Sequence, residues 1–331
     1  MAIAPAAVLS ALRRAWARAD LAPLRLALSA LAEPLLSARR PAQATPEAAR
    51  GVRALHVAGP LKVNPASGAL TRGGRRLDAG PPEAVQTDWL VQAFPSPLSF
   101  PRVAPVWYGR RASVAALLTE ALPAILALDR LAGAREAVAL ISVPLGRLNA
   151  TQQALNAGLF QPRRVRVHAR EKLIAAQGAT VLTGVDPDAG LLDEARARLL
   201  AAFPAQAGEG APVLLCAGGP ARAARLWPGF SRAAADLAAA GVRVIDPETV
   251  PLADLVRALA AAPALAAPET AEAALAFLAP RAPLLLLPGA GPPLAAPPPA
   301  AWRGPIEALS FAIAAAQTGG APPDGGTTHE S

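Results

Sequence analysis

Several residue types that build common functional sites are scarce in this sequence of 331 residues. The single cysteine, Cys216, excludes an internal disulfide and a cysteine-based zinc site. The three histidines, His56, His168 and His329, are too few and too widely spaced for a metal cluster. The chain also has no apolar run near the ~20 residues that a membrane-spanning helix needs. We therefore expect no bound metal and a soluble, cytoplasmic protein.

Aromatic residues make up only 4% of the chain, and arginine supplies almost all of the positive charge. With 32 basic and 24 acidic residues, the formal net charge is +8, which suits nucleic acid or an anionic membrane. The arginines are dispersed, however, and no basic block has interleaved aromatics that could stack on bases. We therefore predict no dedicated nucleic-acid binding. The abundant alanine favours helices that pack closely.

Residues 1–50 are predicted to form two short helices followed by a linker. Apolar residues recur at helical spacing over 6–19 and 21–36, with breaks near Pro23 and Pro34. Arginines among the apolar positions exclude a signal peptide. Two interpretations remain: the helices pack on the body of the protein, or they dock on a membrane surface or a protein partner.

Residues 51–205 are predicted to form a first α/β domain, because short apolar runs alternate with helical patterns. The expected strands are 52–57, a hairpin over 70–77, 103–108, 137–143, 164–168 and 179–183, and the expected helices are 114–131, 151–158 and 189–203. A stretch rich in Gly, Pro and Gln at 204–212 marks the boundary to the next domain.

Residues 206–300 are predicted to form a more regular Rossmann-like domain. Expected strands at 213–217, 242–245, 264–267 and 284–287 alternate with expected helices at 231–240, 252–261 and 270–279. That order predicts a parallel sheet with helices on both faces, which binds ligands beyond the carboxyl ends of its strands. A C-terminal helix over 301–317 and a disordered tail over 318–331 complete the predicted organisation.

A glycine pair at the end of the strand 213–217 is the first candidate ligand site. Gly218 and Gly219 let backbone N–H groups approach a phosphate, and Arg222 and Arg225 lie just beyond, where they could meet a diphosphate. No Lys-Ser/Thr follows, so the segment is not a P-loop. The alternative is an ordinary tight turn beside a solvated helix face.

A second candidate lies at Glu269 and Thr270, where a helix is expected to begin. Its N-terminus offers free N–H groups to an anion, or Thr270 serves only as a helix cap. No catalytic triad is predicted, because Cys216 has no histidine nearby in sequence. Asp186 and Asp188 favour a turn over a metal site.

The order of these motifs resembles glycosyltransferase family 61, whose members are often labelled capsular polysaccharide biosynthesis proteins. The resemblance covers about residues 52–288. It rests on the hairpin over 55–77, on the helix 117–128 with Glu120 and Leu122-Pro123, on the strand and helix from Val213, on Pro247-Glu248 followed by Leu252, and on the stretch 262–287.

The chain also departs from the family at positions where the family carries polar or aromatic side chains. In the helix 117–128 and just before it, Ala116, Leu117 and Ala124 stand where the family has His, Trp and Arg. After the strand from Val213, Ala217 replaces an Arg, and Gly229 and Phe230 replace Asn-Glu. Further on, Glu269 and Thr270 replace His-Gly, and Leu275 falls near an expected Asn. Arg225 keeps one arginine of a family pair. The hydrophobic frame is retained, whereas most of the polar residues are not.

The resemblance implies a GT-B-type architecture of two Rossmann-like domains, with 51–205 on the acceptor side and 206–300 binding a nucleotide sugar. It implies transfer of a hexosyl or pentosyl group to a carbohydrate or protein acceptor in surface polysaccharide biosynthesis, with no bound cofactor. The donor-binding residues would be Gly218, Gly219, Arg222, Arg225, Glu248 and Thr270, with Glu269 as the catalytic base or a sugar contact. The alternative is a catalytically inactive glycosyltransferase-like scaffold or regulatory protein.

Overall fold

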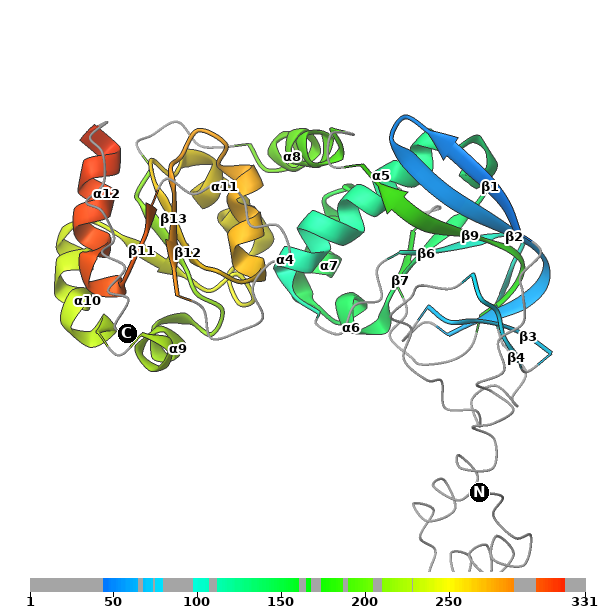
Figure 1. Cartoon of the computed structure of the whole chain (residues 1–331), viewed down its shortest axis with the longest axis horizontal. Helices are drawn as coiled ribbons and strands as arrows, with labels where there is room; N and C mark the ends of the chain where they lie inside the picture. Colours follow the sequence, from blue (N-terminus) through cyan, green and yellow to red (C-terminus); the bar gives the residue numbers. More distant parts are fainter. Residues whose placement is uncertain are drawn as a thin grey trace, which may run out of the picture. The chain divides into compact units, whose positions relative to one another are not determined.

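The structure, a computed structural model, describes residues 44–64, 68–73, 75–79, 98–106, 112–160, 165–167, 174–186, 190–204, 210–227, 229–288 and 302–318. The chain divides into two compact units that alternate along the sequence (Figure 1). The first consists of Met1–Arg110, Ala127–Gly146 and Arg163–Ala189, and the second of Arg111–Leu126, Arg147–Pro162 and Gly190–Ser331. The sequence prediction placed one boundary between residues 205 and 206, whereas the second unit takes in residues 111–126, 147–162 and 190–205 of the predicted first domain.

The first unit is built on a mixed sheet. Its described strands are β1 (Ala44–Ala49), β2 (Val52–Val63), β3 (Leu70–Arg72), β4 (Arg75–Arg76), β5 (Leu98–Phe100), β6 (Val103–Val106), β7 (Val138–Ile141), β8 (Val165–Val167) and β9 (Ile174–Val185). The order is β4-β3-β2-β9-β6-β7-β8, with β1 also paired to β2 and β5 to β9. The strands β9, β6, β7 and β8 are parallel, whereas β1 to β4 and the β2–β9 pair are antiparallel. The expectation of a parallel sheet therefore holds for only part of this unit, because short turns can join only antiparallel strands.

The β1–β2 hairpin corrects the prediction that residues 37–50 form a linker. Arg50 and Gly51 join the strands with φ angles of 49° and 77°, and Ala49 pairs with Val52. Two central residues with positive φ are what a two-residue type I′ turn requires. Pro46 is tolerated in β1 because, among the described strands, β1 pairs only with β2, and an edge strand can lack a donor.

The long helix expected over 114–131 is confirmed, with a local irregularity. It comprises α4 (Val114–Ala116), the π-helical turn η1 (Leu117–Ala121) and α5 (Leu122–Arg130), and the Ser113 hydroxyl accepts a hydrogen bond from Ala116 N at 3.0 Å. Pro123 has no N–H to donate to the preceding turn, and a π turn accommodates that gap. The short helices η2 (Ala132–Ala134), α6 (Val143–Gly146) and α7 (Asn149–Asn156) follow.

The second unit contains the parallel sheet that the sequence predicts. Its described strands are β10 (Val213–Leu215), β11 (Arg243–Ile245), β12 (Leu265–Pro268), β13 (Leu284–Leu287) and β14 (Trp302–Arg303), in the order β11-β10-β12-β13-β14. All the pairings are parallel, and β14 is the one strand that the sequence analysis missed. In chain order the arrangement reads 2-1-3-4-5, a doubly wound α/β order that is compatible with a Rossmann-like fold.

Helices cover both faces of this sheet. The connecting elements are α8 (Leu191–Ala202), α9 (Gly219–Leu226), α10 (Phe230–Ala239), α11 (Leu252–Ala261), the 3₁₀ helix η4 (Ala271–Leu278), η5 (Ile306–Ala308) and α12 (Leu309–Thr318). One layer contains α10 with η5 and α12, and the other contains α11 with α8, η4 and α7. The strands β10, β12 and β13 are consequently buried along their whole length, and Leu284–Leu287 is apolar throughout.

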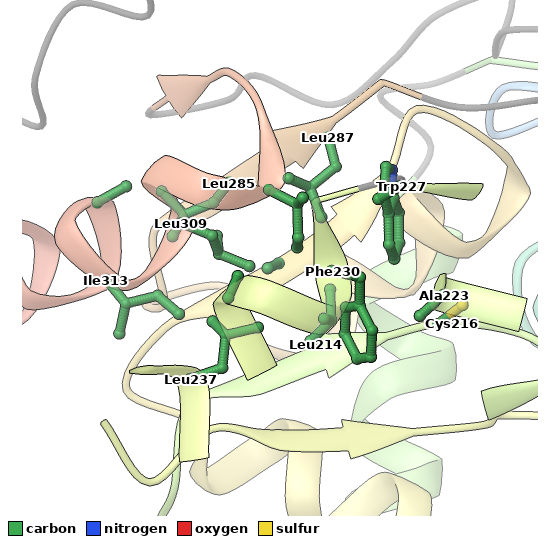
Figure 2. Packing of buried hydrophobic residues seen from close by; sticks show 14 of the residues in the cluster. Leu214, Cys216, Ala223, Trp227, Phe230, Leu237, Leu285, Leu287, Leu309 and Ile313 are labelled. Atoms are coloured by element: carbon green, nitrogen blue, oxygen red, sulfur yellow. The ribbon is translucent and has the colours of Figure 1, made fainter. Parts of the chain in front are cut away.

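One buried cluster explains the layer formed by α10 and α12 (Figure 2). Leu285 and Leu287 of β13 lie two residues apart, so both side chains point to the same face of the sheet. Phe230, Ala233 and Leu237 of α10, and Leu309, Ala312 and Ile313 of α12, recur at helical spacing and enter the same cluster.

Several sequence predictions lie outside the described residues, namely the helices over 6–19 and 21–36 and the tail beyond Thr318. Thr318 itself ends α12. In the described part of the chain, no helix is long and apolar enough to cross a membrane.

Candidate functional site

The two loops singled out from the sequence leave the same edge of the second unit's sheet. β10 and β12 are parallel neighbours, and the loops at Cys216–Gly219 and Glu269–Thr270 follow their carboxyl ends. After β10 the chain crosses to β11 on one side, and after β11 it returns to β12 on the other. Strand order therefore reverses between β10 and β12, which is where doubly wound sheets bind ligands.

The glycine pair forms a tight turn that begins α9. Gly218 and Gly219 have φ angles of 86° and 63°, in a region that residues other than glycine rarely adopt. The N–H of Gly219 donates to the carbonyl of Cys216 at 2.8 Å, so this amide is already used by the turn. No side chain in the described residues caps α9, and because Pro220 has no N–H, the N–H of Ala221 is the first-turn group left for a ligand.

The two arginines of α9 are exposed and differ in their distance from the glycine turn. A Cβ placed on Gly218 would lie 2.9 Å from Cδ of Arg222, so the Arg222 side chain passes directly beside the turn. Arg225 lies one helical turn further on, about 4.5 Å along the helix axis at 1.5 Å per residue. Arg222 is therefore the better placed of the two to meet an anion at the start of α9.

Asp246, which the sequence analysis did not select, lies beside the glycine turn. It follows β11 directly, and its Cβ lies 3.9 Å from the position that a Cβ on Gly219 would take. Its Oδ1 accepts a hydrogen bond from the N–H of Glu248 at 3.0 Å. An acidic residue at the end of the second strand is where doubly wound nucleotide-binding domains contact ribose hydroxyls. Its spacing after the glycines could have identified it from the sequence.

Glu248 has a structural partner at this edge. Its Oε1 accepts a hydrogen bond from the N–H of Val114 at 3.0 Å, and thus caps the helix that begins with α4. Glu248 is exposed, yet the surrounding chain partly desolvates its carboxyl group and raises its pKa. The Val114 N–H acts against that rise, whereas the charges of Asp246 and Glu272 add to it.

A second cap joins the same loop to α7. The side-chain oxygen of Gln153 accepts a hydrogen bond from the N–H of Leu252, the first residue of α11, at 2.5 Å. Glu248 and Gln153 together therefore tie the loop between β11 and α11 to the segments 112–126 and 147–160. This explains why the early segments belong to the second unit.

Glu269 and Thr270 are also bonded within the protein. Glu269 Oε1 forms an ion pair with Arg303 Nε at 3.1 Å, and the N–H of Glu269 donates to the carbonyl of Leu287 at 2.9 Å. Thr270 occupies the predicted N-cap position, but its hydroxyl donates to the carboxylate of Glu272 and caps no backbone N–H. The expected cap is therefore replaced by a side-chain pair.

Cys216 has the properties of an inert, structural cysteine. Its side chain is fully buried, and burial raises the pKa of its thiol to about 11. The positive charge of Arg222 lowers this pKa, while Glu272 and Asp246 raise it. At neutral pH the thiolate needed for nucleophilic attack is essentially absent.

Four of the positions that depart from the resembled family contribute no polar side chain to this edge, namely Ala116, Ala217, Gly229 and Leu275. Ala116, Ala217 and Leu275 are buried, the last of them completely. Gly229 is packed so closely against Glu307 that a Cβ there would lie 1.7 Å from Glu307 Oε1. These four positions are therefore filled by packing.

The chain matches no protein-family model, and its sequence matches no curated protein. Among the residues that the structure describes, no group of three His, Cys, Asp or Glu side chains is arranged to hold a metal ion. The edge therefore combines a glycine turn, the start of α9 and Arg222 with the carboxylates of Asp246, Glu248 and Glu272. Such a set can accept hydrogen bonds from hydroxyl groups and has one basic position for a phosphate.

Proposed function

We propose that the second unit binds the nucleotide part of a nucleotide sugar at the carboxyl edge of β10, β11 and β12. The observation that carries this proposal is the left-handed Gly218-Gly219 turn, placed beside Asp246 where the strand order reverses. In this proposal Asp246 accepts hydrogen bonds from the ribose hydroxyls, and the start of α9 and Arg222 meet the phosphates. Arg225 lies one helical turn further from the phosphates than Arg222. Thr270 and Glu248 are bonded to Glu272 and to the N–H of Val114, and support the site through these contacts.

The wider proposal is a glycosyltransferase-like protein of the family 61 kind, with a GT-B-type pair of Rossmann-like domains. A glycan or protein acceptor and a role in surface polysaccharide biosynthesis belong to this proposal. Its support is the motif order over residues 52–288, together with the doubly wound sheet in the second unit.

We further propose that this protein transfers sugar weakly or not at all and acts as a scaffold or regulatory protein. The specific observation is the state of Glu269, the candidate base, whose carboxylate is paired with Arg303 at 3.1 Å. The ion pair engages this carboxylate in a contact within the protein, whereas a general base needs its carboxylate free to take a proton from the acceptor hydroxyl. The apolar residues Ala116, Ala217 and Leu275 supply no replacement group.

Calorimetric titration of the full chain with uridine, guanosine and cytidine diphosphates tests the binding proposal. We expect at least one of them to bind, and we expect Arg222→Ala to weaken that binding about tenfold by removing a charge-assisted contact. Arg232→Ala, an exposed arginine on α10, is the matched control and should bind as the wild type does. If no nucleotide binds, or if both variants lose the same affinity, the proposed site is wrong.

A sensitive donor-turnover assay with a panel of nucleotide sugars tests the proposal on catalysis. Each lost transition-state contact costs roughly 10²–10³ in rate, so we expect turnover near the background level. Robust turnover that falls sharply in Glu269→Ala would instead show an active transferase in which Glu269 serves as the base. That result would eliminate the scaffold proposal.

A further inference from the structure

A hydroxyl, an imidazole and a carboxylate form a hydrogen-bonded row in the first unit, whereas the proposed nucleotide site belongs to the second unit. Thr180 Oγ1 lies 3.0 Å from Nδ1 of His56, and Nε2 of His56 lies 2.5 Å from Oε2 of Glu47. The residues come from β9, β2 and β1, and His56 faces Thr180 directly across the strand pair. No sequence motif predicts this arrangement of three side chains, because Thr180 is 124 residues from His56.

The carboxylate of Glu47 also holds the turn that follows α5. Its Oε1 accepts a hydrogen bond from the N–H of Ala132 at 2.9 Å, and its Oε2 accepts one from the N–H of Gly133 at 3.2 Å. A Cβ on Gly133 would lie 2.8 Å from His56 Nε2 and 2.9 Å from Glu47 Oε2. Glycine at this position thus lets the turn approach the two side chains.

The arrangement has the composition of a nucleophile–base–acid triad, but its geometry does not suit catalysis. The Thr180 side chain is 0% exposed, so no substrate reaches the hydroxyl. Both oxygens of Glu47 and both nitrogens of His56 already have partners. With a neutral imidazole, Nε2–H donates to Glu47 and the Thr180 hydroxyl donates to Nδ1, so every polar group in the row is satisfied.

We infer that Glu47, His56 and Thr180 form an acid-sensitive latch that fastens the β1–β2 hairpin to the turn at Ala132–Ala134. The latch joins four parts of the first unit that are distant in sequence: β1, β2, β9 and the turn. Protonation of Glu47 turns one carboxylate oxygen into a hydroxyl and removes the negative charge, which weakens the hydrogen bonds that it accepts from Ala132 and Gly133. The hairpin and the turn would then separate without unfolding the rest of the unit.

Nearby hydrogen-bond donors favour the ionised form of Glu47. Hydrogen bonds from His56, Gly133 and Ala132 outweigh desolvation and hold the pKa of Glu47 below its ordinary value. Two arginines near the latch are bonded to backbone carbonyls: Arg102 donates to Gly133 and Arg130 donates to Arg50. The other charged groups around it are the Arg53–Asp186 pair, Asp129, Arg135 and Glu136. A group with a depressed pKa stabilises the folded state above its ordinary pKa, and this contribution disappears as the pH falls through the depressed value.

Hydrogen exchange of the full-length protein, measured by mass spectrometry, tests the latch. At pH 7 we expect Glu47→Gln to accelerate exchange in the segment 131–134 about tenfold, since three hydrogen bonds to a carboxylate are replaced or lost. The control is Glu136→Gln, an exposed glutamate two residues beyond the turn, which should exchange as the wild type does. In urea unfolding, the advantage of the wild type over Glu47→Gln should vanish as the pH falls from 7 to 3.

The wild type alone provides a second measurement in case Glu47→Gln does not fold. Below pH 4 its segment 131–134 should open selectively, after correction for intrinsic exchange rates, while β10 and β12 stay protected. Equal effects of Glu47→Gln and Glu136→Gln, or an unchanged wild-type segment at low pH, would overturn the latch. Labelling of Thr180 by a fluorophosphonate would also overturn it, because only an accessible, activated hydroxyl reacts.

Discussion

At the scale of single residues, the polar side chains at the sheet edge are engaged mainly with the protein itself. Glu248 caps a helix, Glu269 pairs with Arg303, and Thr270 donates to Glu272. Asp246 is also partly engaged, since it accepts the N–H of Glu248, but it lies beside the glycine turn. Polar residue types at a strand end therefore do not by themselves establish a ligand site, because loops and helix ends need the same groups.

Glu248 allows a test of this structural role through the pH dependence of stability. Its pKa is raised above the ordinary 4.5 in the folded protein. At pH values between 4.5 and the raised pKa, the folded state therefore binds more protons than the unfolded state. Its contribution to stability is thus present at low pH and lost as the pH rises through this window. We expect Glu248→Gln to gain stability relative to the wild type between pH 4 and pH 7, as measured by urea unfolding.

The control for this experiment is Asp236→Asn, an exposed carboxylate on α10, which should follow the wild type across the same pH range. Glu248→Ala removes the cap altogether and should be less stable than Glu248→Gln at every pH. A difference between Glu248→Gln and the wild type that does not change with pH would contradict the raised pKa.

At the scale of helices and strands, hydrophobic periodicity was sufficient where an element is buried on both sides. The apolar runs of β10, β12 and β13 and the helical spacing in α10 and α11 predict the second unit's parallel sheet. β1 was missed because Pro46 lies inside it, and β14 was missed because a Pro-rich segment precedes it. Both strands depend on pairing with the rest of the sheet, which local sequence does not show. The latch and the two cross-element caps were not predictable, since they depend on contacts between distant segments.

The packing of α12 gives a prediction at this scale. Leu309 is 0% exposed within the cluster shared with β13 and α10, whereas Phe311 on the same helix is 72% exposed. We expect Leu309→Ala to lower the free energy of unfolding by about 2–5 kcal/mol through lost burial and a cavity. Phe311→Ala should change it by no more than about 0.5 kcal/mol, despite the larger side chain. Urea unfolding of both variants measures the contrast, and equal losses would show that α12 packs differently.

At the scale of the whole molecule, the segments of the two units alternate along the chain. The sequence prediction of consecutive domains, divided at residue 206, follows from a change in composition at 204–212. A change in composition indicates where the alternation of strands and helices is interrupted. It does not indicate on which unit the preceding helices pack. Packing of α4 and η1 on η4, and of α7 on α11, assigns those helices to the second unit.

This alternation predicts that the Rossmann-like sheet does not fold from its own contiguous segment. A fragment of residues 190–318 keeps all the strands from β10 to β14 but lacks Val114 and Gln153, the partners of Glu248 and Leu252. It also lacks the buried side chains Leu117 and Leu118 of the helix that packs on η4. Unpaired polar groups and an uncovered apolar face both oppose folding, so we expect no cooperative urea transition by circular dichroism, whereas the full chain unfolds cooperatively. A sharp transition in the fragment would show that the early segments are accessory to the sheet.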